Sequence, residues 1–136
     1  MPLLVSILKF QIHYLSSMAA IKEYKSFAEF YPYYLTEHAR PVNRTLHFIG
    51  TALVISCFVG AFILNKGWLL FILPFCGYGF AWVGHFIFEK NKPATFIYPL
   101  YSLGSDFVMF WHILTGKIDK KVEEAHQTLG IANKWK

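Results

Sequence analysis

Two long apolar segments joined by three residues constrain the fold of this chain more than any other feature. Residues 45–64 and 68–88 are apolar, and residues 65–67 between them read Asn-Lys-Gly. A helix of about 20 residues is about 30 Å long, which matches the hydrocarbon core of a bilayer. The short polar turn forces the second helix back along the first. The sequence therefore predicts a transmembrane helical hairpin.

The composition agrees with a membrane protein. The chain of 136 residues is 55% hydrophobic and 15% charged, whereas soluble domains average about 25% charged residues. We expect an all-α, polytopic membrane protein with one domain, residues 1–136. The net charge of +5 comes from scattered basic residues, so we expect no nucleic-acid partner. Cys57 and Cys76 fall within the apolar segments and are expected to be buried free thiols.

Three further segments complete the predicted fold. Residues 19–35 have the pattern of an N-terminal amphipathic helix lying at the membrane interface, with an aromatic belt in residues 31–34. Residues 94–116 predict a third long helix, which either spans the membrane or packs against the hairpin through a stripe of Ser102, Asp106 and Met109. Residues 117–136 predict a short polar helix. Residues 1–17 read as a non-native extension, with Met18 as the natural start, or as a signal peptide.

Two prolines and one asparagine mark expected boundaries. Pro41 should end the preceding element, Asn43 should cap the first hairpin helix, and Pro74 should kink the second.

The short turn at residues 65–67 is the easier one to translocate across the membrane. This favours an orientation in which the opposite, histidine-bearing face lies toward the cytoplasm.

Four ionisable side chains should meet at one end of the hairpin. His47 lies at the start of the first apolar segment, His85 lies at the end of the second, His38 precedes them, and Glu89 follows His85 by one helical turn. Ionisable groups at membrane depth are costly and mark functional sites. Histidines with a carboxylate are a usual ligand set for non-haem iron, so the expected metal ligands are His38, His47, His85 and Glu89. Alternatively, Glu89 bonds to His85 or pairs with a nearby cation.

Other polar residues are assigned to the surroundings of this cluster. Arg44, Lys90 and Lys92 could bind a substrate carboxylate or, equally, lipid phosphate. Asp106 is expected to bond to Ser102, or to a histidine as the partner of a metal ligand. The remaining histidines should not belong to the cluster: His13, His112 and His126.

Two blocks of residues resemble a known family. The first is residues 33–38 followed by Pro41, Asn43, Arg44 and His47, and the second is Gly84, His85, Glu89, Lys90, Pro93 and Ala94. Together they resemble the 2-hydroxy fatty acid dioxygenase family known from yeast phytosphingosine breakdown, and the resemblance covers residues 27–116.

The resemblance implies an integral-membrane enzyme of fatty acid α-oxidation. It would use Fe²⁺ to convert a 2-hydroxy fatty acid and O2 into the fatty acid one carbon shorter. His38, His47 and His85 match the family's histidines by position, accompanied by Asn43 and Glu89. The turn at residues 65–67 is shorter than the eukaryotic insertion, so fewer spans are expected. The chain looks like a bacterial member, which implies a bacterial inner-membrane location.

A rival hypothesis is a non-enzymatic membrane scaffold or lipid-binding protein with a structural metal site. Metal analysis of the purified protein distinguishes this hypothesis from the enzyme hypothesis. The sequence leaves the oligomeric state open, with a homo-oligomer among the alternatives.

Overall fold

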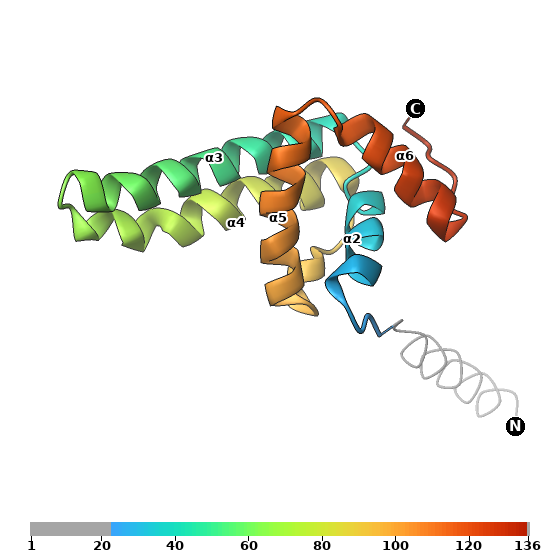
Figure 1. Ribbon diagram of the computed structural model, residues 1–136, viewed down its shortest axis with the longest axis horizontal. Helices are drawn as coiled ribbons and strands as arrows, with labels where there is room; N and C mark the ends of the chain where they lie inside the picture. Colours follow the sequence, from blue (N-terminus) through green and yellow to red (C-terminus); the bar gives the residue numbers. More distant parts are fainter. Residues whose placement is uncertain (1–22, 136) are drawn as a thin grey trace, which may run out of the picture.

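The structure is a computed structural model that describes residues 23–135, and all of its regular elements are helical in that range (Figure 1). The all-α prediction is therefore confirmed for these residues, whereas the predictions for residues 1–22 lie outside them. The α-helices are α2 (Phe27–Thr36), α3 (Pro41–Ile63), α4 (Leu73–Val83), α5 (Pro99–Leu114) and α6 (Ile118–Leu129). The shorter helices are η1 (Gly67–Ile72), η2 (Gly84–Glu89) and η3 (Ala94–Phe96).

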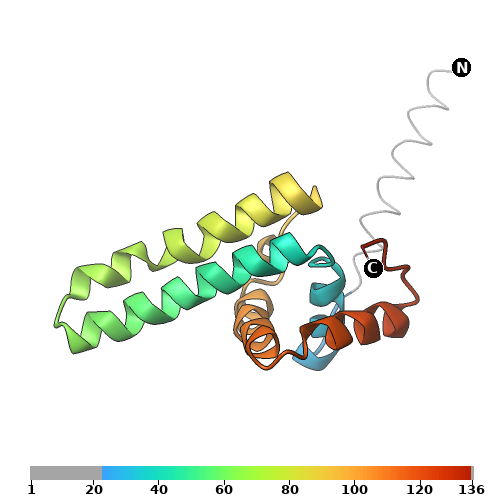
Figure 2. The same ribbon diagram turned by 90° about the horizontal axis from the view of Figure 1, so that it is seen from above.

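The predicted hairpin is present. Helix α3 and the continuous arm η1–α4–η2 run antiparallel, side by side, in both views (Figures 1 and 2). The turn includes Asn65, whose φ of 51° lies in the left-handed region. Both arms are long and apolar enough to cross a membrane, judged by length and composition.

Helix α3 begins earlier than predicted. Pro41 is at its start, and Arg40, with extended backbone, is the residue before the helix. The prediction that Pro41 ends the preceding element and that Asn43 is the N-cap is therefore wrong. Proline suits the first helical position because its φ is already helical and its missing N–H has no intrahelical partner there.

The second arm changes helix type twice. It begins as the 3₁₀-helix η1, continues as α4, and ends as the π-helix η2. Pro74 lies in the first turn of α4, so it marks the change from η1 rather than a kink inside α4. The arms approach closely at Gly50, where an added Cβ would lie 2.9 Å from the Cys76 carbonyl oxygen. Cys57 and Cys76 are free and only partly buried.

No third spanning helix is found among residues 23–135. Helix α5 has 16 residues and crosses the hairpin steeply rather than running beside it (Figures 1 and 2). The alternative of a packed helix with an inward polar stripe is confirmed, because Ser102, Ser105 and Met109 are buried.

A compact helical unit sits at the open end of the hairpin. Helix α2 packs on α5 and α6 (Figure 2). The shared core consists of Phe30, Tyr34, Leu35, Ala94, Met109, Val122 and Ala125. The interfacial location of α2 stays a prediction, whereas Tyr34 is buried in this core rather than part of an exposed belt. The tyrosines of α2 pack among other aromatic rings, and helical periodicity cannot distinguish that environment from a lipid interface. Helix α6 confirms the short polar helix.

Candidate metal centre

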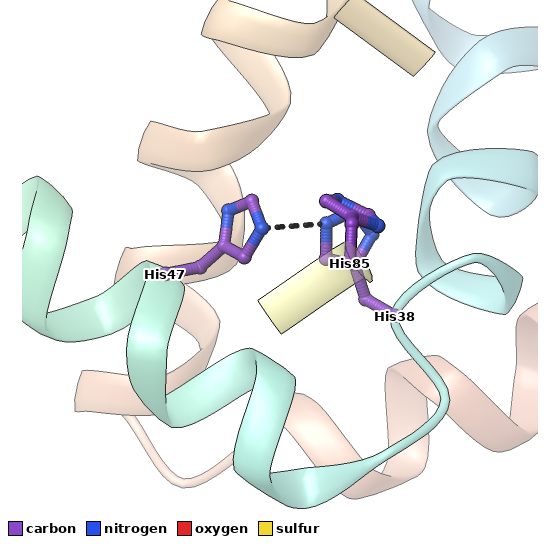
Figure 3. Close-up of side chains that lie close together, drawn as sticks. All are labelled: His38, His47 and His85. Atoms are coloured by element: carbon purple, nitrogen blue, oxygen red, sulfur yellow. Dashed lines mark hydrogen bonds between the residues drawn. The ribbon is translucent and has the colours of Figure 1, made fainter. Parts of the chain in front are cut away.

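Three histidines from three separate elements converge in the buried centre of the molecule. His38 lies in the loop after α2, His47 in the second turn of α3, and His85 in η2. One ring nitrogen of each lies within 4.8 Å of the others, and their exposed fractions are 0%, 6% and 2%. Figure 3 shows the His47 imidazole facing the other two rings. The predicted meeting of these three histidines is confirmed as a geometric fact.

The Nδ1 atom of each histidine has a fixed hydrogen-bond acceptor. His38 Nδ1 donates to the Tyr34 carbonyl oxygen at 2.6 Å, and His47 Nδ1 donates to Asp106 Oδ1 at 2.7 Å. His85 Nδ1 donates to Asn91 Oδ1 at 2.8 Å. A carbonyl and a carboxylate can only accept, so these contacts place the ring proton on Nδ1.

Glu37 orients the side-chain amide of Asn91, which identifies the Asn91 atom that faces His85 Nδ1. Its Nδ2 donates to the carbonyl oxygen and to Oε2 of Glu37, at 3.0 and 2.9 Å. Because the amide nitrogen faces two acceptors, the amide oxygen must face His85. All three histidines therefore carry a proton on Nδ1, which leaves Nε2 as the nitrogen available to a metal ion.

The Nε2 atoms of His38 and His47 lie within hydrogen-bond distance of each other, 3.1 Å apart. Burial, together with the nearby rings of His47 and His85, lowers the pKa of His38 well below its usual value. The doubly protonated form of His38 is therefore disfavoured. A neutral imidazole whose other nitrogen is hydrogen-bonded is the usual form that binds metal. The donor set fits a divalent transition metal.

Asp106 links the cluster to Tyr34. Its Oδ1 accepts from both His47 Nδ1 and the Tyr34 hydroxyl. Burial and the charge of Asp106 raise the pKa of Tyr34 well above its usual value, so its hydroxyl stays a donor. Of the two predictions for Asp106, the bond to a histidine is confirmed. Ser102 Oγ is buried without a hydrogen-bond partner among the described residues.

Glu89 lies outside the three-histidine group. Its Oε1 accepts from the Arg40 backbone N–H at 2.6 Å and from Asn43 Nδ2 at 3.5 Å. A carboxylate at this position accepts a hydrogen bond from an N–H group that has no partner within the helix. Its negative charge also interacts favourably with the positive end of the α3 dipole. The structure thus places Glu89 at the start of α3, and its predicted bond to His85 is replaced by these contacts.

Asn43 is a packing residue beneath η2. It is fully buried, and a Cβ added to Gly84 would lie 1.9 Å from its Oδ1. The glycine therefore lets η2 approach α3 closely, which brings His85 to His47.

The three predicted cations do not ring the histidines. Arg44 is buried, and its guanidinium donates to the carbonyls of His38 and Ala39 and to Asp119. It thus holds the loop that carries His38. Lys90 and Lys92 are exposed, and none of the three cations lines the adjoining cavity.

An apolar cavity of about 310 Å³ adjoins the histidines. His47, His85, Tyr34 and Asp106 form its polar end. Its remaining walls come mainly from apolar residues of the hairpin and α5, including Val54, Leu73, Trp82, Leu103 and Phe107.

Two functional contacts were not predicted from sequence. Asn91 is a loop residue with no periodic pattern, and Tyr34 was assigned to an aromatic belt. The only available signals were the polar character of Asn91 inside the second family-like block and the position of Tyr34 four residues before His38.

The fold and site define an all-helical protein in which a histidine cluster able to hold a metal ion ends an apolar cavity. A family model described as 2-hydroxy-palmitic acid dioxygenase Mpo1-like matches residues 24–118. The chain belongs to this family, as the resemblance in the sequence predicted. No curated protein and no solved structure matched the chain.

Proposed function

We propose that this protein is an Fe²⁺-dependent dioxygenase that converts a long-chain 2-hydroxy fatty acid and O2 into the fatty acid one carbon shorter. The observation that carries the proposal is a buried group of three histidines, two of which, His47 and His85, line the polar part of an apolar cavity. Membership of the family supports the same activity. His38, His47 and His85 would hold the iron.

The surrounding residues keep the histidines ready for metal. Asp106, Asn91 and the Tyr34 carbonyl accept hydrogen bonds from the three Nδ1 atoms, which leaves Nε2 of each histidine available to a metal ion. When bound, ferrous iron supplies the redox chemistry with O2. Glu89 and Asn43 support the site indirectly by joining η2 to the start of α3.

The cavity favours a substrate with one apolar end and one chelating end. Its apolar walls suit an acyl chain, and no Lys or Arg of the described residues lines it. A substrate carboxylate in the cavity would therefore have no cationic side chain as its partner. A 2-hydroxy acid can form a five-membered chelate through its hydroxyl and carboxylate, which a 3-hydroxy or unsubstituted acid cannot form. This chelation would select the substrate.

The hairpin would anchor the enzyme in a membrane. Its lipid-facing surface would include exposed Phe58, Phe62, Phe71 and Phe75, and each arm has the length and apolarity of a membrane span. We place the protein in a bacterial inner membrane with the histidines toward the cytoplasm.

Turnover by iron-loaded protein in lipid vesicles tests the proposal. Oxygen uptake and product length are measured with 2-hydroxypalmitate, 3-hydroxypalmitate and palmitate. We expect uptake and a one-carbon-shorter acid with 2-hydroxypalmitate alone. Equal turnover of all three acids would exclude selection by chelation. No turnover with iron bound would favour a scaffold with a structural metal.

A further inference from the structure

Helix α5 exposes apolar side chains and buries polar ones, the reverse of a helix on a water-facing surface. Its exposed residues are all apolar, whereas Ser102 and Ser105 on its inner face are buried. Five of the exposed residues follow one another at spacings of three and four, which puts them on one face of the helix. This face, called here the α5 stripe, consists of Leu100, Leu103, Phe107, Trp111 and Leu114.

The neighbouring helix shows what a water-facing surface of this protein looks like. All exposed residues of α6 are polar: Asp119, Lys120, Gln127 and Thr128. In contrast, the α5 stripe has no charged member, and Leu100 is 80% and Trp111 59% exposed. Phe96 and Ile97, also exposed, extend the apolar surface beyond the start of α5. Large apolar patches of this kind mark interaction sites.

The direction of α5 identifies the partner as a lipid bilayer. Helix α5 crosses the hairpin steeply (Figures 1 and 2). If the hairpin crosses the membrane, α5 must lie close to the membrane plane. A helix in that orientation with one wholly apolar face is typical of interfacial helices.

The cavity reaches the surface beside the stripe. Leu103 and Phe107 belong to the stripe and also line the cavity. Opposite them, Tyr78 and Trp82 of α4 line the cavity and are 42% and 43% exposed. The cavity is thus bordered at the surface by side chains of both the hairpin and the stripe.

We propose that the α5 stripe lies in the bilayer interface at the histidine-bearing end of the hairpin, so that the cavity opens sideways into lipid. The substrate then enters as a membrane-dissolved long-chain acid rather than from water. The identity of this substrate rests on the proposed function, whereas the placement of α5 does not.

Spin labels on the full chain in phosphatidylcholine–phosphatidylglycerol vesicles test this placement. Single cysteines replace Leu100, Trp111 and Leu114 in a Cys57→Ala, Cys76→Ala background, with Lys120 and Gln127 on α6 as water-facing controls. Labels at Ile49 and Phe58 report depth along α3. Accessibility to O2 and to a water-soluble nickel complex is measured at each position.

We expect the three stripe labels to favour O2 and to share one depth, while the α6 labels favour nickel and the α3 labels differ in depth. Nickel accessibility at the stripe equal to that at Lys120 would overturn the proposal. Depth that changes steadily along α5 would do the same, because α5 would then span the membrane. Exclusion of both reagents would indicate a second copy of the chain instead of lipid.

A substitution at the opening tests the route of entry. Leu103→Trp should raise KM for vesicle-borne 2-hydroxypalmitate several-fold with iron content unchanged, whereas Gln127→Trp on α6 should not. An unchanged KM for Leu103→Trp would overturn sideways entry. If the native chain oxidises none of the acids, the proposed function fails, but the spin labels still decide whether α5 lies in lipid.

Discussion

The Nε2 atoms of His38 and His47 lie 3.1 Å apart in a buried site, while the Nδ1 atom of each is hydrogen-bonded to an oxygen acceptor. Two facing lone pairs at this distance repel each other unless a proton or a metal ion lies between them. His85 brings a third ring nitrogen within 4.8 Å of the other two. The arrangement therefore has the geometry of a three-histidine metal site.

The carboxylate of Asp106 should tune the metal site through His47. Asp106→Asn removes the negative charge that stabilises the His47 Nδ1 proton and supports its Nε2 as a ligand. Loss of such a partner typically weakens metal affinity about 10- to 100-fold. Competition with a calibrated chelator measures this affinity. Asp119→Asn, which removes the partner of Arg44 on an exposed side chain, should have a smaller effect, and equal losses would contradict the assignment.

The close approach of η2 to α3 should make Gly84 intolerant of a side chain. Gly84→Ala would place Cβ 1.9 Å from Asn43 Oδ1, and such overpacking typically costs about 1–3 kcal/mol. Gly79→Ala is the matched control because nothing lies within 4 Å of its added Cβ. Denaturation in detergent should show a loss of stability for Gly84→Ala but not for Gly79→Ala. Adding Asn43→Ala to Gly84→Ala should recover part of it, and equal stability of both single variants would refute the contact.

Alkaline pH should destabilise the unit formed by α2, α5 and α6. Burial, with a smaller effect of the nearby Glu37 charge, raises the pKa of Tyr33 to about 12, compared with about 10 in an unfolded chain. A raised pKa contributes stability below about pH 10, and this contribution is lost as the pH rises through about 12. Thermal melting across this range should show the decline, and Tyr33→Phe should reduce it. A pH-independent melting temperature would contradict the burial argument.

The hairpin could be predicted because its signal is local: two apolar segments and a three-residue turn. The convergence of His47 and His85 follows from that antiparallel pairing, and His38 was included because it lies only nine residues before His47. Whether α5 spans the membrane or lies across the hairpin depends on contacts between distant segments of the chain. An apolar helix with inward Ser102 has the same periodicity whether it spans the membrane or lies across the hairpin, so the sequence could not decide between them.

The role of Glu89 shows a second limit of sequence reasoning. Its spacing from His85 suited a shared metal, yet the free N–H group of Arg40 competes for the same carboxylate. Arg44 is similar, since its charge suggested a substrate contact but the carbonyls of the His38 loop and Asp119 bind it instead. Such competition becomes visible only when the start of α3 is placed beside η2.

The most direct test of the three-histidine site is an anaerobic Fe²⁺ titration of the full chain and four single variants. His38→Ala, His47→Ala and His85→Ala each remove one Nε2, while His126→Ala removes a buried histidine whose Nδ1 bonds to the Val122 carbonyl in its own helix. We predict one tightly bound iron per chain in the native protein and in His126→Ala, and loss of that stoichiometry in the other three. Full iron occupancy in any of these three variants would contradict the site.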